Sequence, residues 1–170
     1  ALSVIYAFFK LFPQKPHKIL FLSRQSDRLS LDFSLLKTEL EKQNSKAKIH
    51  AICNRMDDSK KGLLRFGFNT LASMYHLATA KVCVLDAYWP VVSMLRHKKG
   101  LTVIQMWHAL GKIKQSGYQT LDKESGRSKE LSHLLCMHKN YDYIIAGGKA
   151  WNPYYVASFG TTEDKLVNIG

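Results

Sequence analysis

Short apolar runs alternate with longer helical stretches along almost the whole chain, and this alternation constrains the fold more than any other feature. Each run is rich in Ile, Val and Leu and apolar at nearly every position, as strands buried on both faces are. The predicted strands cover residues 18–23, 48–53, 81–86, 102–107, 142–147 and 165–169. Helices are predicted between them, over residues 31–43, 60–79, 128–139 and 151–159. The apolar face expected on the helix 60–79 is formed by Leu64, Phe68, Leu71, Tyr75 and Ala78.

Strand and helix in strict succession predict βαβ units, and hence an α/β fold with a Rossmann-like, doubly wound, mostly parallel sheet. Ligands of such sheets bind at the carboxyl ends of the strands, so the loops after the strands are the candidate site. The stretch 108–127 is unusually long for a connection and is therefore expected to be functional or mobile. No G-x-G-x-x-G motif follows the first strand, which argues against a dinucleotide site.

The composition indicates a globular domain with an anionic partner. Of the 170 residues, 46% are apolar and 22% charged, and 25 Lys and Arg against 13 Asp and Glu give a net charge of +12. A nucleic acid, a phosphate-rich polymer or an acidic membrane would each suit this charge. The basic residues are dispersed and no RNA-binding motif is present, so we expect no nucleic acid partner. The cysteines Cys53, Cys83 and Cys136 are widely spaced, which favours a reducing cytoplasm.

The first 16 residues form a separate unit in this interpretation, an N-terminal amphipathic helix over 1–16, with the Rossmann-like domain over 17–170. The apolar residues of this segment recur at helical spacing, and they are Leu2, Ile5, Phe8, Phe9 and Phe12. The segment is too short to cross a bilayer, but it could lie on an anionic membrane surface with its lysines among the headgroups. Packing against the sheet is the equal alternative.

The most informative residues are Trp107 and His108, which end a buried strand and open the long loop. An imidazole at that edge is suited to proton transfer near neutral pH. Lys112 and Lys114 follow closely and could contact phosphate oxygens. The alternative is a histidine that only caps its strand with a hydrogen bond.

Weaker candidates lie after other strands. Ser23 and Arg24 end the first strand, where a phosphate could meet backbone N–H groups and a guanidinium, or the turn could simply be solvated. Asp86 ends the third strand and could orient a ligand hydroxyl or cap the following turn. We expect Trp89 and Trp151 to be packing residues. No metal site is predicted, because the histidines and cysteine near residue 136 offer too few ligands.

The segment Gln105-Met106-Trp107-His108, followed by a small residue and Gly111-Lys112, resembles the Trp-His-Gly motif of the CDP-glycerol:polyol-phosphate glycerophosphotransferases. These enzymes build teichoic acids and related polymers. The similarity extends over most of the chain, through residues 77–86, 141–145, 157–160 and 165–170. One departure is Ala109, which stands where the family usually has a glycine, and it leaves the loop's shape and the acceptor open.

The resemblance implies one half of a GT-B-type enzyme, whose two Rossmann-type domains face a cleft. The chain would be the acceptor-side domain, with the C-terminal donor-binding domain outside it, and would be inactive alone. His108 would remove the proton from the acceptor hydroxyl, which attacks the β-phosphorus of CDP-glycerol and releases CMP, with no cofactor. The substrate-binding residues would be Ser23, Arg24, Trp107, Lys112 and Lys114.

The same resemblance implies a lipid-linked polyol-phosphate acceptor and an enzyme that is cytoplasmic and peripheral on the inner face of the cell membrane. Two other functions stay open at this point. One is a basic α/β module that binds nucleic acid. The other is a non-catalytic homologue of the transferase domain, which the alanine at position 109 favours.

Overall fold

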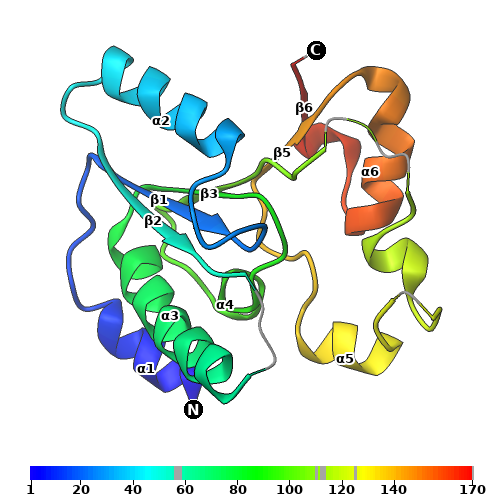
Figure 1. The fold of residues 1–170 in the computed structure, drawn as a ribbon, viewed down its shortest axis with the longest axis horizontal. Helices are drawn as coiled ribbons and strands as arrows, with labels where there is room; N and C mark the ends of the chain where they lie inside the picture. Colours follow the sequence, from blue (N-terminus) through cyan, green and yellow to red (C-terminus); the bar gives the residue numbers. More distant parts are fainter. Residues whose placement is uncertain (56–58, 110, 112–113, 125, 170) are drawn as a thin grey trace.

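The computed structural model describes residues 1–55, 59–109, 111, 114–124 and 126–169. A single six-stranded sheet with the order β2-β1-β3-β4-β5-β6 organises this part of the chain, and every neighbouring pair is parallel (Figure 1). The strands are β1 (Lys18–Ser23), β2 (Lys48–Cys53), β3 (Val82–Leu85), β4 (Thr102–Gln105), β5 (Tyr143–Ala146) and β6 (Leu166–Asn168). The predicted α/β fold with a doubly wound parallel sheet is confirmed.

The helices follow the strands largely as predicted. They are α1 (Leu2–Phe9), α2 (Leu31–Gln43), α3 (Lys60–Thr79), α4 (Pro90–Met94), α5 (Lys129–Leu134) and α6 (Asn152–Phe159), with 3-10 turns η1 (Gly117–Thr120), η2 (Lys149–Trp151) and η3 (Glu163–Lys165). The bounds of α2 and α3 match the prediction, whereas α1 and α5 are shorter than predicted and α4 was not predicted. Serine side chains cap the N-termini of α2, α3 and α5, which fixes where these helices begin.

The two faces of the sheet carry cores of different size. Figure 1 shows α2 on one face and α1, α3 and α4 on the other. The face covered by α3 holds the large core, where Leu20, Leu22 and Leu85 are fully buried. On the α2 face only Phe21, Phe33 and Val84 are buried, and the first two stack with ring centroids 4.7 Å apart. Because β1 and β3 contribute to both cores, they form the rigid centre of the domain.

The prediction that all strands are buried on both faces is wrong for the sheet edges. No residue of β2 or β6 is fully buried, because each of these strands has a neighbour on one side only. The inward face predicted for α3 is also partly wrong. Leu64 and Phe68 are 77% and 73% exposed, and the buried face runs instead through residues such as Met74 and Leu77 in the second half of the helix.

The N-terminal segment packs on α3 through one side of α1. Tyr6 is buried, and the rings of Phe9 and Phe12 each lie 5.8 Å from the ring of Tyr75. The opposite side of the segment stays open, with Phe8 exposed. Packing of the segment is therefore confirmed, and membrane contact stays a prediction. In the described part of the chain, no helix combines the length and apolar character needed to cross a bilayer.

Candidate functional site

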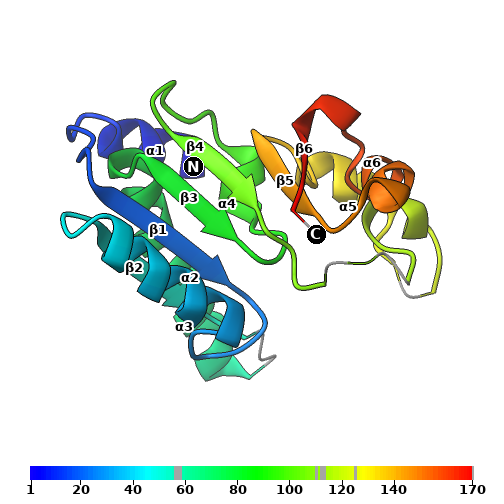
Figure 2. The ribbon, with the colours of Figure 1, turned by 90° about the horizontal axis from the view of Figure 1, so that it is seen from above.

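The candidate site lies at the carboxyl ends of β1, β3 and β4, where the strand order changes direction. From β1 the chain passes to β2 on one side, and later returns to place β3 and β4 on the other. Figure 2 shows these three strands as neighbouring arrows that point the same way. Ser23 ends β1, Asp86 follows β3, and His108 follows β4 closely. Open α/β sheets form ligand crevices at such a point.

His108 is an exposed residue whose imidazole is held through its Nδ1 atom. Nδ1 lies 3.0 Å from the backbone carbonyl oxygen of Asp86 and 3.2 Å from the side-chain amide nitrogen of Gln25. In the tautomer that donates from Nδ1 to this carbonyl, the lone pair is on Nε2. The Trp107 ring lies against the imidazole, with centroids 4.2 Å apart. No described residue forms a hydrogen bond with Nε2, which is therefore available to a ligand from this part of the chain, as a general base requires.

The backbone at Trp107 turns the chain sharply out of β4. Its φ of +60° lies in the left-handed region, which a bulky residue seldom adopts. The buried side chain of Gln105 stabilises the turn, because its Oε1 accepts the Trp107 N–H at 2.8 Å. Ala109 is not among the residues with positive φ, and its carbonyl accepts the Tyr155 hydroxyl at 2.8 Å. The alanine in place of the family's glycine is thus compatible with this loop, since the strained position precedes His108.

Asp86 connects the end of β3 to the end of β1 through its carboxylate. Its carboxylate is buried and accepts the Ser23 hydroxyl at 2.6 Å and the Arg24 backbone N–H at 3.2 Å. Burial raises the pKa of the Asp86 carboxyl, and these hydrogen bonds oppose that shift. The carboxylate therefore secures the loop after β1, a role that neither sequence interpretation included. Ser23 is itself fully buried, so its hydroxyl faces Asp86 and not the solvent.

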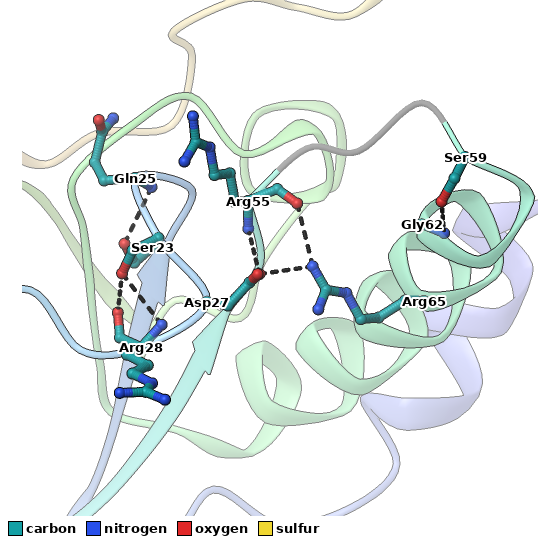
Figure 3. A network of polar contacts seen from close by, with 9 residues as sticks. Ser23, Gln25, Asp27, Arg28, Arg55, Ser59, Gly62 and Arg65 are labelled. Carbon is teal, nitrogen blue, oxygen red and sulfur yellow. Dashed lines mark hydrogen bonds and ion pairs between the residues drawn. The ribbon is translucent and has the colours of Figure 1, made fainter.

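The loop after β1 is secured on its outer side by a polar network (Figure 3). The carboxylate of Asp27 accepts the Arg65 guanidinium at 2.6 Å and the Arg55 backbone N–H at 3.0 Å. At the inner side of the same loop, the backbone N–H of Gln25 donates to Ser23 Oγ at 3.3 Å. Gln25, which contacts His108, is thus carried on a loop tied to β1, β2 and α3.

Two adjoining cavities open beside Trp107. The smaller, about 460 Å³, is lined by His108 and Ala109, and the larger, about 630 Å³, by Tyr88 and Arg127. The predicted residue Lys114 is exposed and lines both cavities.

The other predicted residues fall in different places. Arg24 is half-buried and donates from Nη1 to the Tyr88 carbonyl at 3.0 Å, and burial is the main cause of its lowered pKa. Lys112 lies outside the described residues. Trp89 is buried, and Trp151 packs on the large core, as predicted.

Sequence reasoning missed Gln25, Tyr88 and Arg127. All three lie in or beside stretches marked as candidate loops, but their contacts depend on how those loops fold back. In the described residues, no group of three His, Cys, Asp or Glu side chains is placed to hold a metal ion.

Residues 4–170 match the family described as CDP-Glycerol:Poly(glycerophosphate) glycerophosphotransferase. The chain belongs to this family. A relative in Bacillus spizizenii, named teichoic acid ribitol-phosphate primase, is 31% identical over 160 residues, covering 94% of this chain and 41% of the relative. The teichoic acid glycerol-phosphate primase of Bacillus subtilis is 26% identical over 100 residues, covering 59% of this chain and 26% of the relative. The family resemblance inferred from the sequence is confirmed.

The fold also matches a solved structure, that of the wall teichoic acid polymerase TagF. The TM-score is 0.70 at 15% identity, covering 99% of this chain and 42% of that chain. The chain therefore spans less than half the length of these relatives. The family description refers to a transferase, and the names of these relatives refer to teichoic acid synthesis.

Proposed function

We propose that this chain is the acceptor-side domain of a GT-B-type transferase that moves glycerol phosphate from CDP-glycerol to a lipid-linked, teichoic-acid-type polyol phosphate. The observation that carries the proposal is His108, exposed at the carboxyl end of β4 and anchored through Nδ1 on the Asp86 carbonyl. CDP-ribitol is the alternative donor, because the names of some relatives specify ribitol phosphate. The donor would bind mainly to a second domain, in the part of the relatives that this chain does not cover.

In the proposed reaction, Nε2 of His108 removes the proton from the acceptor hydroxyl. The hydroxyl oxygen then bonds to the β-phosphorus, the bond from that phosphorus to the bridging oxygen breaks, and CMP leaves. Lys114 contacts the phosphate oxygens, and Trp107 orients the imidazole against its ring. Ser23 and Arg24 support the site indirectly. Ser23 donates a hydrogen bond to the Asp86 carboxylate, and Arg24 donates one to the Tyr88 carbonyl. In this proposal, the acceptor-side domain contributes only amino-acid side chains to the reaction and uses no cofactor.

The test is the His108→Ala variant of the enzyme that contains this domain. Loss of a positioned base lowers turnover by about 10²–10⁴-fold, so glycerophosphate transfer should fall by that order while the circular dichroism spectrum is unchanged. His133→Ala is the matched control, because His133 is exposed on α5 and lies outside the cavity linings. Near wild-type transfer by a folded His108→Ala variant would favour the non-catalytic homologue.

The placement of the donor has its own test. Titration calorimetry of the 170-residue chain with CDP-glycerol should detect no binding tighter than about 1 mM. Micromolar binding would mean that this domain, and not a second one, holds the donor.

We further propose that the domain is cytoplasmic and lies on the anionic inner face of the cell membrane. Support comes from a surface on α1 and α3 where Phe8, Leu64 and Phe68 are 60%, 77% and 73% exposed. Lys10, Lys60 and Lys61 lie on the same two elements or at their ends. Apolar side chains flanked by lysines suit an interface of acyl chains and anionic headgroups.

Vesicle sedimentation tests this location. The chain should bind anionic vesicles at low salt and neutral vesicles weakly, and Phe68→Ser should reduce binding to the anionic vesicles. Leu35→Ser is the control, because Leu35 is 61% exposed on α2, on the opposite face of the sheet. Equal loss in both variants would contradict a specific membrane surface on α1 and α3.

A further inference from the structure

The larger cavity beside Trp107 is strongly cationic and has no assigned role in the proposed reaction. It has a volume of about 630 Å³, and its described lining residues include Lys114, Lys123 and Arg127 but no Asp or Glu. It adjoins the smaller cavity that contains His108, and the two share part of their lining. The shared residues are Trp107, Lys114, Gln115 and Ser116. A ligand chain could therefore extend from His108 into the larger cavity.

Two guanidinium groups converge on Tyr88 at the wall of this cavity. The guanidinium carbon of Arg127 lies 5.0 Å from the centroid of the Tyr88 ring, and Arg24 binds the Tyr88 carbonyl from another loop. The ion pairs formed by the described residues lie on α2 and between Asp27 and Arg65, so neither Arg24 nor Arg127 has a carboxylate partner there. Burial, followed by the charge of Arg127, lowers the pKa of Arg24, and Tyr88 and the Asp86 carboxylate oppose this shift more weakly. An anionic ligand between the two guanidinium groups would relieve the remaining repulsion.

The turn that carries Arg127 is fixed before any ligand binds. The Arg127 carbonyl accepts the Asp122 N–H at 3.0 Å, and Asp122 Oδ1 accepts the Lys129 N–H at 2.9 Å at the start of α5. Gly126 passes so close to Thr120 that a Cβ atom would lie 1.6 Å from the Thr120 carbonyl oxygen. These contacts fix the backbone on either side of Arg127, and the Tyr88 ring positions its guanidinium, which favours a specific site over a diffuse attraction.

We infer that the larger cavity binds a phosphodiester of the acceptor chain, at a repeat unit behind the hydroxyl that reacts at His108. This inference rests on the proposed function, because the acceptor is a polyol phosphate only in that case. Arg127 is the main phosphate ligand, through the paired N–H donors of its guanidinium, and Lys114 and Lys123 add charge at the cavity wall. Arg24 acts as a positioning residue behind Tyr88. The site would make the enzyme prefer acceptors that already contain an internal phosphodiester.

The direct test uses the 170-residue chain and glycerophosphoglycerol, a soluble phosphodiester with a glycerol on each side. In a ¹H–¹⁵N NMR titration, the amides of Gly117 and Gly126 at the cavity should shift, and glycerol alone should shift neither. Arg127→Gln should weaken binding about tenfold, as loss of a charged hydrogen bond predicts. Arg96→Gln is the control, since it removes the same charge from an exposed position outside this cavity.

Equal weakening by the two substitutions, or shifts that avoid Gly117 and Gly126, would overturn the inference. In transfer assays, Arg127→Gln should raise KM several-fold more for acceptors with an internal phosphodiester than for a single-unit acceptor. The NMR titration needs neither donor nor turnover, so its outcome is independent of the His108 test. If the chain binds the phosphodiester but the enzyme shows no His108-dependent transfer, the cavity site stands and the proposed function is wrong.

Discussion

The two ends of the sheet bury ionisable groups of opposite charge, a carboxylate at the carboxyl end and an ammonium group at the amino end. At the carboxyl end, the buried Asp86 carboxylate has hydrogen-bond partners from β1, and the backbone at Trp107 is strained. At the amino end, the buried Lys18 ammonium donates to Thr79 Oγ1 at 2.6 Å and lies 4.8 Å from the Tyr75 ring. Burial, with a contribution from Lys15, lowers the pKa of Lys18 to about 8.

The difference lies in how each end compensates a buried ionisable group: the Asp86 carboxylate accepts two hydrogen bonds, whereas Lys18 lies near a second lysine. The carboxyl end has long loops, two cavities and a carboxylate that orders the backbone near His108. The amino end has short connections closed by backbone hydrogen bonds, such as the Lys48 N–H to the His17 carbonyl at 2.8 Å. Its basic side chains lie close together without an acidic partner among the described residues. Backbone strain and ligand-sized cavities are therefore concentrated at the candidate site, whereas the amino end holds basic groups whose pKa burial lowers.

The largest effect is expected at Gly117, on the long loop of the carboxyl end. Its φ is +59°, and an added Cβ atom would lie 2.1 Å from the Ser158 carbonyl oxygen. Gly117→Ala should lower the free energy of unfolding by about 2–4 kcal/mol, from left-handed strain plus the displaced neighbour. Urea unfolding of the chain measures this change.

Gly67→Ala in α3 provides the matched control, because apart from the adjoining helix backbone no described atom lies within 4 Å of its added Cβ. That substitution should instead stabilise the chain by about 0.5–1 kcal/mol, since alanine is the better helix former. A small effect at Gly117 would mean that the loop around the larger cavity adapts easily, which would weaken the comparison between the two ends.

A smaller effect is expected from Ser23→Ala, which removes a donor to the buried Asp86 carboxylate. Loss of a hydrogen bond to a charged group should lower the free energy of unfolding by about 1.5–3 kcal/mol. Ser26→Ala, in the same loop, is the control, and its effect should stay within about 0.5 kcal/mol because the hydroxyl contacts only the exposed Arg28 backbone. Similar values for both serines would show that the Asp86 network does not differ from an ordinary surface turn.

Much of the fold was predictable because local pattern and tertiary structure agree in the centre of the sheet. Each predicted strand is present within two residues of its predicted bounds, and α2 and α3 match. The errors have a common cause. Apolar periodicity identifies a face of a helix or strand but not whether another element covers it, so Phe68 and the edge strand β2 were predicted to be buried and are not.

The site was predictable in position more than in contacts. His108 became a candidate because it follows a predicted buried strand and lies in a segment that resembles the family motif, and Lys114 because it follows closely in sequence. Both line the smaller cavity, and their roles stay predictions. The supporting residues could not be found in this way. Asp86 and Gln25 contact His108 across separations of 22 and 83 residues, and no local pattern reports such contacts. The strained φ at Trp107 was likewise not predicted, because the family motif places its usual glycine at position 109 and a tryptophan gives no sign of a left-handed backbone.

The smallest effect is expected at the amino end and depends on pH. The Nδ1 atom of His76 is buried and lacks a hydrogen-bond partner among the described residues, and its ring lies 4.7 Å from that of His50. Burial, followed by the charges of Lys18, His50 and Lys15, lowers the pKa of His76 to about 4. The unfolded chain, with a pKa near 6.5, therefore takes up this proton first as the pH falls.

The stability due to neutral His76 is consequently complete above about pH 6.5 and is lost as the pH falls toward 4. After a discount for the exposed part of the ring, the loss should be about 1 kcal/mol. Urea unfolding at about pH 7 and about pH 4.5 measures it, and His76→Leu should reduce the difference between the two values. His133→Leu, at an exposed position on α5, should retain the wild-type difference. If His76→Leu also retains the wild-type difference between the two pH values, protonation of His76 does not destabilise the fold. The acid sensitivity of the chain then originates elsewhere.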